Sequence, residues 1–232
     1  MKQPKIVVGR IGYSNSTLLV NGPDSILIDT GVKGFLYKIK RMIKLSGLIP
    51  GNIRLIVLTH THYDHTGNLS ELKELTGAQV LVHKDEFENL KKGYMPIPGG
   101  QRFLIKAVSG MGKLFFPGFA SPRPFTADLI NEGEFDLKPY GISGKVIHTP
   151  GHSAGSQSVV LGKTIISGDC FMNMNYGVVF PHFAENSVLL LKSWERIFAM
   201  GIEEIYPGHG KKLMQGKAYP VYLKWKRKLK VE

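Results

Sequence analysis

The sequence has little cysteine: Cys170 is the only one among 232 residues. A single thiol excludes an internal disulfide and a zinc site built from cysteines, so any metal would be held by nitrogen and oxygen ligands. Long apolar runs are also missing, because none approaches the roughly 18 residues that a membrane-spanning helix requires. Residues 1–6 lack the apolar core of a signal peptide, and we therefore expect a cytoplasmic location.

The composition that is present is typical of a soluble globular protein, with 43% hydrophobic and 21% charged residues. The chain is long enough to bury a substantial core as one domain or as two fused halves. We interpret residues 1–232 as a single domain.

Positive charge is in excess, because 30 basic residues against 18 acidic ones give a net charge of +12. The tail at residues 211–232 carries +7 of this charge, from eight basic residues and Glu232, which leaves +5 for the rest. A basic tail with Trp225 suits phosphates or an anionic membrane surface. A solvated terminal helix with one apolar face explains it more simply, so nucleic acid is an alternative partner and not the favoured one.

Residues 59–67, with the sequence Thr-His-Thr-His-Tyr-Asp-His-Thr-Gly, hold the densest group of metal-ligating side chains. They follow an apolar run and precede a segment with helical spacing, which indicates a loop from a strand to a helix. In an extended segment, side chains two positions apart point to the same side, so His60 and His62 can bind one cation together. Asp64 and His65 then face elsewhere. This indicates two adjacent metal positions, because four donors on so short a loop cannot converge on one tetrahedral ion.

Apolar periodicity predicts alternating strands and helices around this loop. In the first half we expect strands at 6–11, 17–20, 25–29, 53–58 and 79–82, and helices at 34–46 and 68–75. In the second half we expect strands at 134–138, 145–149, 156–161, 164–167 and 204–206, and a helix at 186–200. Residues 91–130 break the pattern with many glycines, prolines and aromatic residues, and we interpret them as a lid or substrate-pocket insertion.

Three later segments each place one potential metal ligand in a glycine-rich turn after a predicted strand. These ligands are His152, Asp169 and His209. Loops that follow strands at one edge of a sheet converge in space. We therefore expect these three side chains to join the loop at residues 59–67.

With these motifs the sequence resembles the metallo-β-lactamase-fold hydrolase superfamily, and within it the glyoxalase II-like and lactonase-like small hydrolases. The resemblance extends from Asp29 to His209 and implies an α/β (α+β) fold, an αββα sandwich of two mixed β-sheets flanked by helices. It also implies two sets of metal ligands joined by a bridging carboxylate. The first set is His60, His62 and His152, the second is Asp64, His65 and His209, and the bridge is Asp169.

This ligand set favours two zinc ions, although nitrogen and oxygen donors also suit iron or manganese. Two divalent ions about 3.5 to 4 Å apart share a water, lower its pKa and present hydroxide to an electrophile. We therefore expect hydrolysis of a small-molecule substrate, namely an ester, a thioester or a lactone. The resemblance suggests that Asp64 also holds a proton for the leaving group.

Two other activities remain open as alternatives. A phosphodiesterase or nuclease of the same fold could use the basic tail to hold phosphates. An iron-dependent oxidoreductase like the persulfide dioxygenases needs only one facial triad of ligands, whereas Asp64, His65 and His209 here complete a second set. The sequence does not fix the oligomeric state, and a homo-oligomer is compatible with it.

Further residues are candidates for supporting roles. Asp29, at the end of a predicted strand, either hydrogen-bonds a ligand histidine or caps a turn. Tyr63 and His182 are candidate substrate contacts, with a structural role as the favoured alternative for each. Cys170 is expected to be a small buried residue. The last two histidines, His83 and His148, match no ligand motif, and we expect them to be structural.

Overall fold

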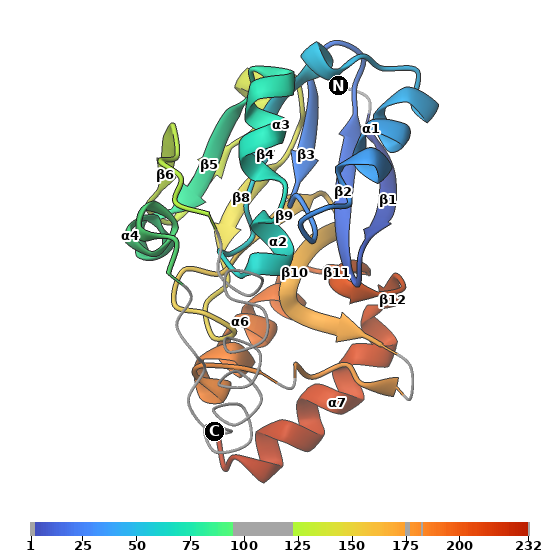
Figure 1. The fold of residues 1–232 in the computed structure, drawn as a ribbon. Coiled ribbons are helices and arrows are strands. Elements are labelled where there is room, and N and C mark those ends of the chain that lie inside the picture. Colours follow the sequence, from blue (N-terminus) through green and yellow to red (C-terminus); the bar gives the residue numbers. More distant parts are fainter. Residues whose placement is uncertain (1–2, 95–122, 175–176, 182, 232) are drawn as a thin grey trace.

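Two six-stranded sheets organise the computed structural model, which describes residues 3–94, 123–174, 177–181 and 183–231 (Figure 1). The first sheet has the strand order β1-β2-β3-β4-β5-β6. Its strands are β1 (Lys5–Ile11), β2 (Ser14–Val20), β3 (Ser25–Ile28), β4 (Ile53–Val57), β5 (Gln79–His83) and β6 (Leu129–Asn131). The first three are antiparallel neighbours, whereas β3, β4, β5 and β6 run parallel.

Parallel strands need long crossover connections, and the helices of the first half are found in them. These helices are α1 (Leu36–Leu45), the 3-10 turn η1 (Pro50–Asn52), the short α2 (Tyr63–Thr66), α3 (Leu69–Thr76) and α4 (Lys84–Lys92). In α1 the side chains of Ile39, Met42 and Ile43 recur at three and four positions, and all three are buried. The helix α3 ends at Gly77, whose φ of +69° suits a residue without a Cβ atom.

The second sheet has the order β12-β11-β10-β9-β8-β7. Its strands are β7 (Glu134–Asp136), β8 (Lys145–His148), β9 (Gln157–Leu161), β10 (Thr164–Asn173), β11 (Glu204–Gly210) and β12 (Leu213–Met214), with the 3-10 turn η2 (Lys138–Tyr140) after β7. Only β10 and β11 are parallel, and α6 (Ser187–Ala199) connects them. The chain then continues into α7 (Gln215–Lys228).

Successive side chains of a strand point to opposite faces of its sheet. The buried apolar residues therefore form three clusters. On β3, Ile26 and Ile28 belong to the cluster between the two sheets, which also contains Val146 and Val159 of the second sheet. Leu27, between them, faces the opposite way and packs with α1 and α3. A third cluster around Trp194 joins the second sheet to α6 and α7. The layers therefore run helix, sheet, sheet, helix, which confirms the predicted αββα sandwich.

Most predicted elements are present, but the structure differs from the prediction in several places. The helix α4 and the strand β6 were not predicted, so the proposed insertion at 91–130 was drawn too wide at both ends. Its central part, residues 95–122, lies outside the described residues. The loop at 59–67 contains the helical turn α2. Finally, β10 and β11 continue through Asp169 and His209, which therefore lie within strands and not in turns after them.

The C-terminal tail is the helix that its sequence predicted. Ala218 and Tyr222, four positions apart, form the buried face of α7. Trp225 stacks on Phe180 with ring centroids 4.1 Å apart. Within the described part of the chain, no helix combines the length and apolar character that a membrane span requires.

Candidate metal centre

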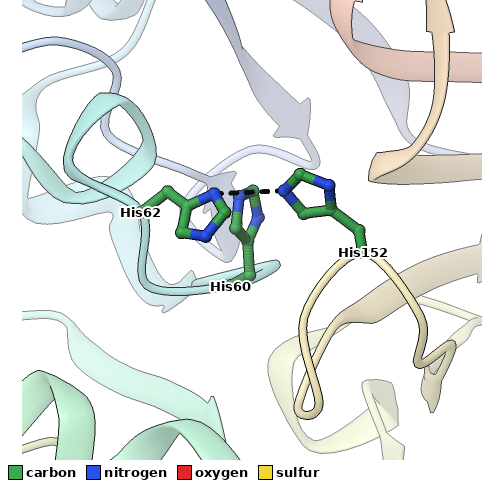
Figure 2. Close-up of side chains that lie close together, drawn as sticks. All are labelled: His60, His62 and His152. Atoms are coloured by element: carbon green, nitrogen blue, oxygen red, sulfur yellow. Dashed lines mark hydrogen bonds between the residues drawn. The ribbon is translucent and has the colours of Figure 1, made fainter. Parts of the chain in front are cut away.

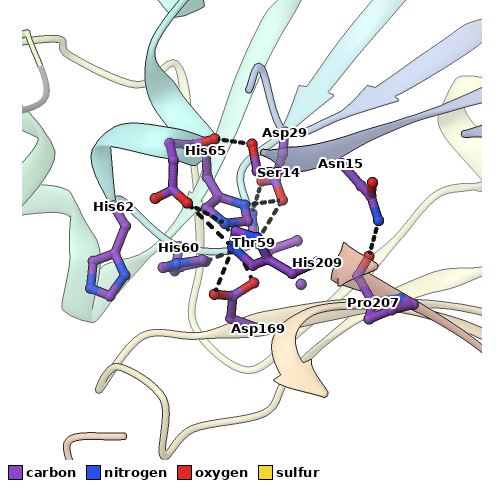
Figure 3. A network of polar contacts seen from close by, with 12 residues as sticks. Ser14, Asn15, Asp29, Thr59, His60, His62, His65, Asp169, Pro207 and His209 are labelled. Carbon is purple, nitrogen blue, oxygen red and sulfur yellow. Dashed lines mark hydrogen bonds and ion pairs between the residues drawn. The ribbon is translucent and has the colours of Figure 1, made fainter. Parts of the chain in front are cut away.

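The potential metal ligands come from segments of both sheets and lie close together, with His152 labelled in Figure 2 and His65, Asp169 and His209 in Figure 3. His60 and His62 follow β4, and the turn α2 adds Asp64 and His65. The second sheet contributes side chains from the loop after β8, from β10 and from β11: His152, Asp169 and His209. All seven are buried. The seven predicted ligands thus lie together in space, although about 150 residues separate the first from the last in the sequence.

Three imidazoles form the first group, drawn in Figure 2. His60, His62 and His152 each offer a ring nitrogen within 4.8 Å of those of the others. His152 Nε2 lies 3.1 Å from His62 Nδ1. Burial and the neighbouring histidines lower the pKa of His62 to about 3 and hold the pKa of His60 well below its usual value. Burial also lowers the pKa of His152. These imidazoles are therefore neutral at pH 7, and neutral imidazole is the form that binds a metal.

Two carboxylates enter the second group. Asp64, His65 and His209 offer ligand atoms within 4.8 Å of one another. His209 Nε2 lies 3.3 Å from Asp64 Oδ2 and 3.3 Å from Asp169 Oδ2, and His65 Nε2 lies 3.4 Å from Asp169 Oδ1. Burial alone would lower the pKa of both histidines, but Asp169 and its neighbouring carboxylates raise the pKa of His65 to about 9 and that of His209 to about 11. The carboxylates around His65 and His209 therefore favour positive charge at this place.

Asp169 lies between the two groups. One of its oxygens, Oδ2, is 3.6 Å from His152 Nε2 of the first group and 3.3 Å from His209 Nε2 of the second. Burial would raise the pKa of this carboxyl, but His209, His65 and His152 hold it well below its usual value. The bulged register between β10 and β11 around Gly168 brings Asp169 and His209 to the same place.

Several of these atoms have no hydrogen-bond partner among the described residues. His60 Nε2, His62 Nε2, His65 Nε2 and Asp169 Oδ1 are buried and accept or donate no hydrogen bond among the described residues. A buried polar atom without a partner costs about 1 to 3 kcal/mol, and such atoms are rare in folded proteins. Divalent cations satisfy several imidazole and carboxylate atoms at once. The donor set therefore fits divalent metal ions.

Asp29 supports the loop from behind. Its Oδ1 accepts the Thr59 backbone N–H at 2.8 Å, and its Oδ2 accepts from Thr59 Oγ1 and from His65 Nδ1, both at 2.8 Å. Asp29 therefore makes the first of the two contacts predicted for it, a hydrogen bond to a candidate ligand histidine. That bond leaves Nε2 of His65 facing Asp64 and Asp169.

Glu86 on α4 is a supporting residue that the sequence did not reveal. It is 2% exposed, and its carboxylate accepts from the Thr61 hydroxyl and, at 3.3 Å, from the Gly155 backbone N–H. Thr61 lies between His60 and His62, and Gly155 lies three residues after His152. Glu86 therefore ties together the two segments that carry the first group. The sequence pattern did not predict the helix α4, and it therefore did not indicate a buried position for Glu86.

Tyr13 and Tyr63 lie at the edge of the second group. Their hydroxyl groups hydrogen-bond to each other. The Tyr13 ring stacks on His209 with centroids 6.2 Å apart, and its carbonyl accepts from His209 Nδ1 at 3.0 Å. Tyr63 is thus near the candidate centre as expected, whereas Tyr13 was not predicted. The other candidate substrate contact, His182, lies outside the described residues.

Cys170, His83 and His148 lie outside the two ligand groups. Cys170 is fully buried in the apolar cluster around Trp194. His83 and His148 stack with ring centroids 3.9 Å apart and planes 14° from parallel. Asp85 Oδ2 lies 3.6 Å from His83 Nδ1. His83, Asp85 and His148 offer ligand atoms within 4.8 Å of one another, but the nearly parallel stacking of the two rings favours the structural role predicted for the histidines.

Comparisons with known proteins agree with this geometry. A family model described as the metallo-beta-lactamase superfamily matches residues 9–209. The probable metallo-hydrolase MJ0888 of Methanocaldococcus jannaschii is 30% identical over 204 residues, which are 86% of this chain and 89% of that protein. The metallo-beta-lactamase family protein TTHA1429 of Thermus thermophilus has the same fold, with a TM-score of 0.70 over 97% of this chain and 80% of that one at 20% identity. A structure of TTHA1623 in a di-iron-bound form matches with a TM-score of 0.63 at 25% identity, over 94% of this chain and 97% of that one.

Proposed function

The chain belongs to the metallo-beta-lactamase superfamily, and from this premise we propose that it is a dinuclear metal-dependent hydrolase of a small ester, thioester or lactone. The observation that carries the proposal is the position of Asp169, with one oxygen within 3.6 Å of His152 and within 3.3 Å of His209. A carboxylate placed between two groups of histidines suits two metal ions that share a ligand.

In this proposal His60, His62 and His152 would hold one ion and Asp64, His65 and His209 would hold the other, with Asp169 available to both groups. Such ions supply a Lewis acid and an activated water when bound. Zinc fits these ligands, and iron is the alternative that the di-iron form of TTHA1623 favours.

The residues of the chain then have distinct tasks. Asp64 has the more exposed carboxylate, since 12% of its side chain is accessible against 5% for Asp169. It is therefore the acid that a leaving group can reach, and we assign it the proton transfer to that group. Asp29 orients His65 through the 2.8 Å hydrogen bond at Nδ1. The partly exposed Tyr63 presents a hydroxyl at the edge of the centre and is a candidate substrate contact.

The test pairs metal analysis with a hydrolysis assay on protein purified without chelator. We expect two metal ions per chain, turnover of an ester, thioester or lactone, loss of turnover with EDTA and recovery when metal is restored. The Asp169→Asn variant should keep its fold, measured by circular dichroism, and lose both the second metal equivalent and most turnover. A fully metallated protein that hydrolyses none of a broad panel would contradict the proposal.

The same assays separate the two alternatives. Cleavage of phosphodiesters in preference to carboxylic esters would favour the phosphodiesterase or nuclease. One iron per chain with thiol-dependent oxygen uptake and no hydrolysis would favour the persulfide dioxygenase-like activity. We rank that activity lower because Asp64, His65 and His209 form a complete second group. A cytoplasmic location and the oligomeric state stay predictions that cell fractionation and light scattering would check.

A further inference from the structure

A pocket of about 640 Å³ adjoins the candidate centre at His209 and Tyr13. Its volume is within the range of about 300 to 1,000 Å³ that small-molecule sites occupy. Four cationic side chains line it: Arg10 of β1, Lys211 and Lys212 between β11 and β12, and Lys217 of α7. Among the described residues, its lining contains no aspartate or glutamate.

Most of this positive charge is not compensated by the protein. Lys212 pairs with Glu204, whose Oε1 lies 2.8 Å from its Nζ. Among the described residues, Lys217 Nζ contacts only the neutral Asn173 Oδ1, at 3.3 Å. Arg10 and Lys211 form no ion pair in the part of the chain that the structure describes. Three cations without carboxylate partners therefore share one concave surface, where their fields add and attract anions.

The basic tail is thus divided into two parts. Lys211, Lys212 and Lys217 line the pocket, whereas no basic residue of α7 beyond Lys217 does. Of the latter, Lys226 pairs with Glu195 at 3.6 Å, and Lys228 lies over the Trp225 ring. Arg10, which is distant in the sequence, completes the pocket. The cations therefore converge on a cavity of small-molecule size, and they do not form one continuous stripe along α7.

We propose that this pocket binds an anionic group of the substrate, a carboxylate or a phosphate, while the ester bond of the same molecule lies at the metal centre. The inference rests on the proposed hydrolase function. It follows from His209, which lines the pocket and at the same time directs its Nε2 toward Asp64 and Asp169. Charge-assisted hydrogen bonds from arginine and lysine recognise both kinds of anion.

The test compares matched aryl esters in the metal-loaded enzyme. One ester has a neutral butyrate acyl group, one has a succinate acyl group that ends in a carboxylate, and one ends in a phosphate. The double variant Arg10→Gln/Lys211→Gln should raise KM for an anionic ester about tenfold, the scale of two exposed charge-assisted contacts. Its KM for the butyrate ester should change less than twofold. The anionic ester whose KM rises more in the double variant carries the anion that the pocket prefers.

The matched control is Lys192→Gln/Lys224→Gln, which removes two exposed helix lysines that do not line the pocket. It should leave all KM values within twofold. Added salt should raise KM for the anionic ester in the wild type and much less in the pocket variant, because ions screen exposed charges. Equal changes for neutral and anionic esters, or no change in either, would overturn the inference.

A binding measurement separates this inference from the proposed function. Calorimetry with the succinate anilide, an amide that keeps the carboxylate, measures binding without ester turnover. If the protein hydrolyses none of the esters but binds the anilide, and the pocket variant weakens that binding about tenfold, the anion site stands and the hydrolase proposal fails. If it hydrolyses the butyrate ester but the pocket variant binds the anilide as the wild type does, the anion site fails and the hydrolase proposal stands.

Discussion

The hydrogen bonds of Asp29 allow a sharp test of how the second ligand group is oriented. Both carboxylate oxygens accept: Oδ1 from the Thr59 backbone N–H, and Oδ2 from the Thr59 hydroxyl and His65 Nδ1, each at 2.8 Å. In Asp29→Asn one oxygen becomes an NH2 group of nearly the same size. If the remaining oxygen keeps the backbone N–H, the new donor faces His65 Nδ1. That nitrogen must then accept, which moves the ring proton to Nε2.

This change of tautomer determines how much more weakly the second metal ion should bind. Nε2 of His65 is the nitrogen that faces Asp64 and Asp169, and a protonated nitrogen cannot bind a metal. Compared with the wild type, the metal-binding tautomer in the variant lacks the hydrogen bond between His65 Nδ1 and a buried carboxylate, a contact of about 1.5 to 3 kcal/mol. Since 1.4 kcal/mol is a factor of ten, the second metal ion should bind roughly 10- to 100-fold more weakly.

The assay is titration of zinc into metal-free protein in competition with a chromophoric chelator. The first equivalent, held by His60, His62 and His152 in our proposal, should keep its affinity within about threefold, and the second should weaken. The control is Asp136→Asn, which makes the same change at an exposed aspartate whose Oδ1 accepts from Lys138 N at 3.0 Å. Wild-type affinity for both equivalents in a folded Asp29→Asn protein would refute the argument.

Three further predictions concern the surrounding structure. Glu86→Ala should lower the free energy of unfolding by about 1 to 3 kcal/mol in urea, because two buried donors lose their acceptor, whereas the exposed Glu88→Ala on the same helix should change it by less than about 0.5 kcal/mol. Burial and the stacked His148 lower the pKa of His83 to about 4, below the 6.5 of an unfolded histidine. The unfolded state therefore binds more protons, and His83 should make stability fall as pH drops from about 6.5 to 4; a His83→Gln variant with an unchanged pH profile would contradict this. Burial raises the pKa of the Cys170 thiol, so a thiol reagent should label it only as the protein unfolds, and rapid labelling of the native protein would oppose this assignment.

The sequence predicted the elements whose own residues show a strong apolar pattern. In β3 and β4 apolar residues fill both faces, because one face packs against the second sheet and the other against α1 and α3. The missed helix α4 lacks such a signal: its buried residues are Glu86 and Leu90, and only one of them is apolar. The strand β6 has three residues, and its existence depends on pairing with β5. Local patterns do not contain that information.

The residues of the candidate site likewise fall into those that the sequence predicted and those that it did not. The seven candidate ligands could be proposed from the sequence because histidines and aspartates occur there in compact motifs at the ends of predicted strands. Supporting contacts such as those of Asn15 and Gln157 could not, since asparagine and glutamine are common and their partners lie far away in the sequence. Asn15 Nδ2 donates to the carbonyl oxygens of Pro207 and Gly210 at 2.9 and 2.8 Å, on either side of His209. Only the packing of the two sheets brings these groups together.

These contacts explain how the donors stay close without relying on the metal alone. Gln157 of the second sheet donates through Nε2 to the Leu58 carbonyl at 2.7 Å, directly before the ligand loop. Glu86 connects that loop to the segment after His152, and Asn15 fixes the segment around His209. Three polar side chains therefore join the two halves of the sandwich around the candidate centre. They hold imidazoles and carboxylates in place although several of these buried atoms have no hydrogen-bond partner among the described residues, a cost that bound divalent cations would offset.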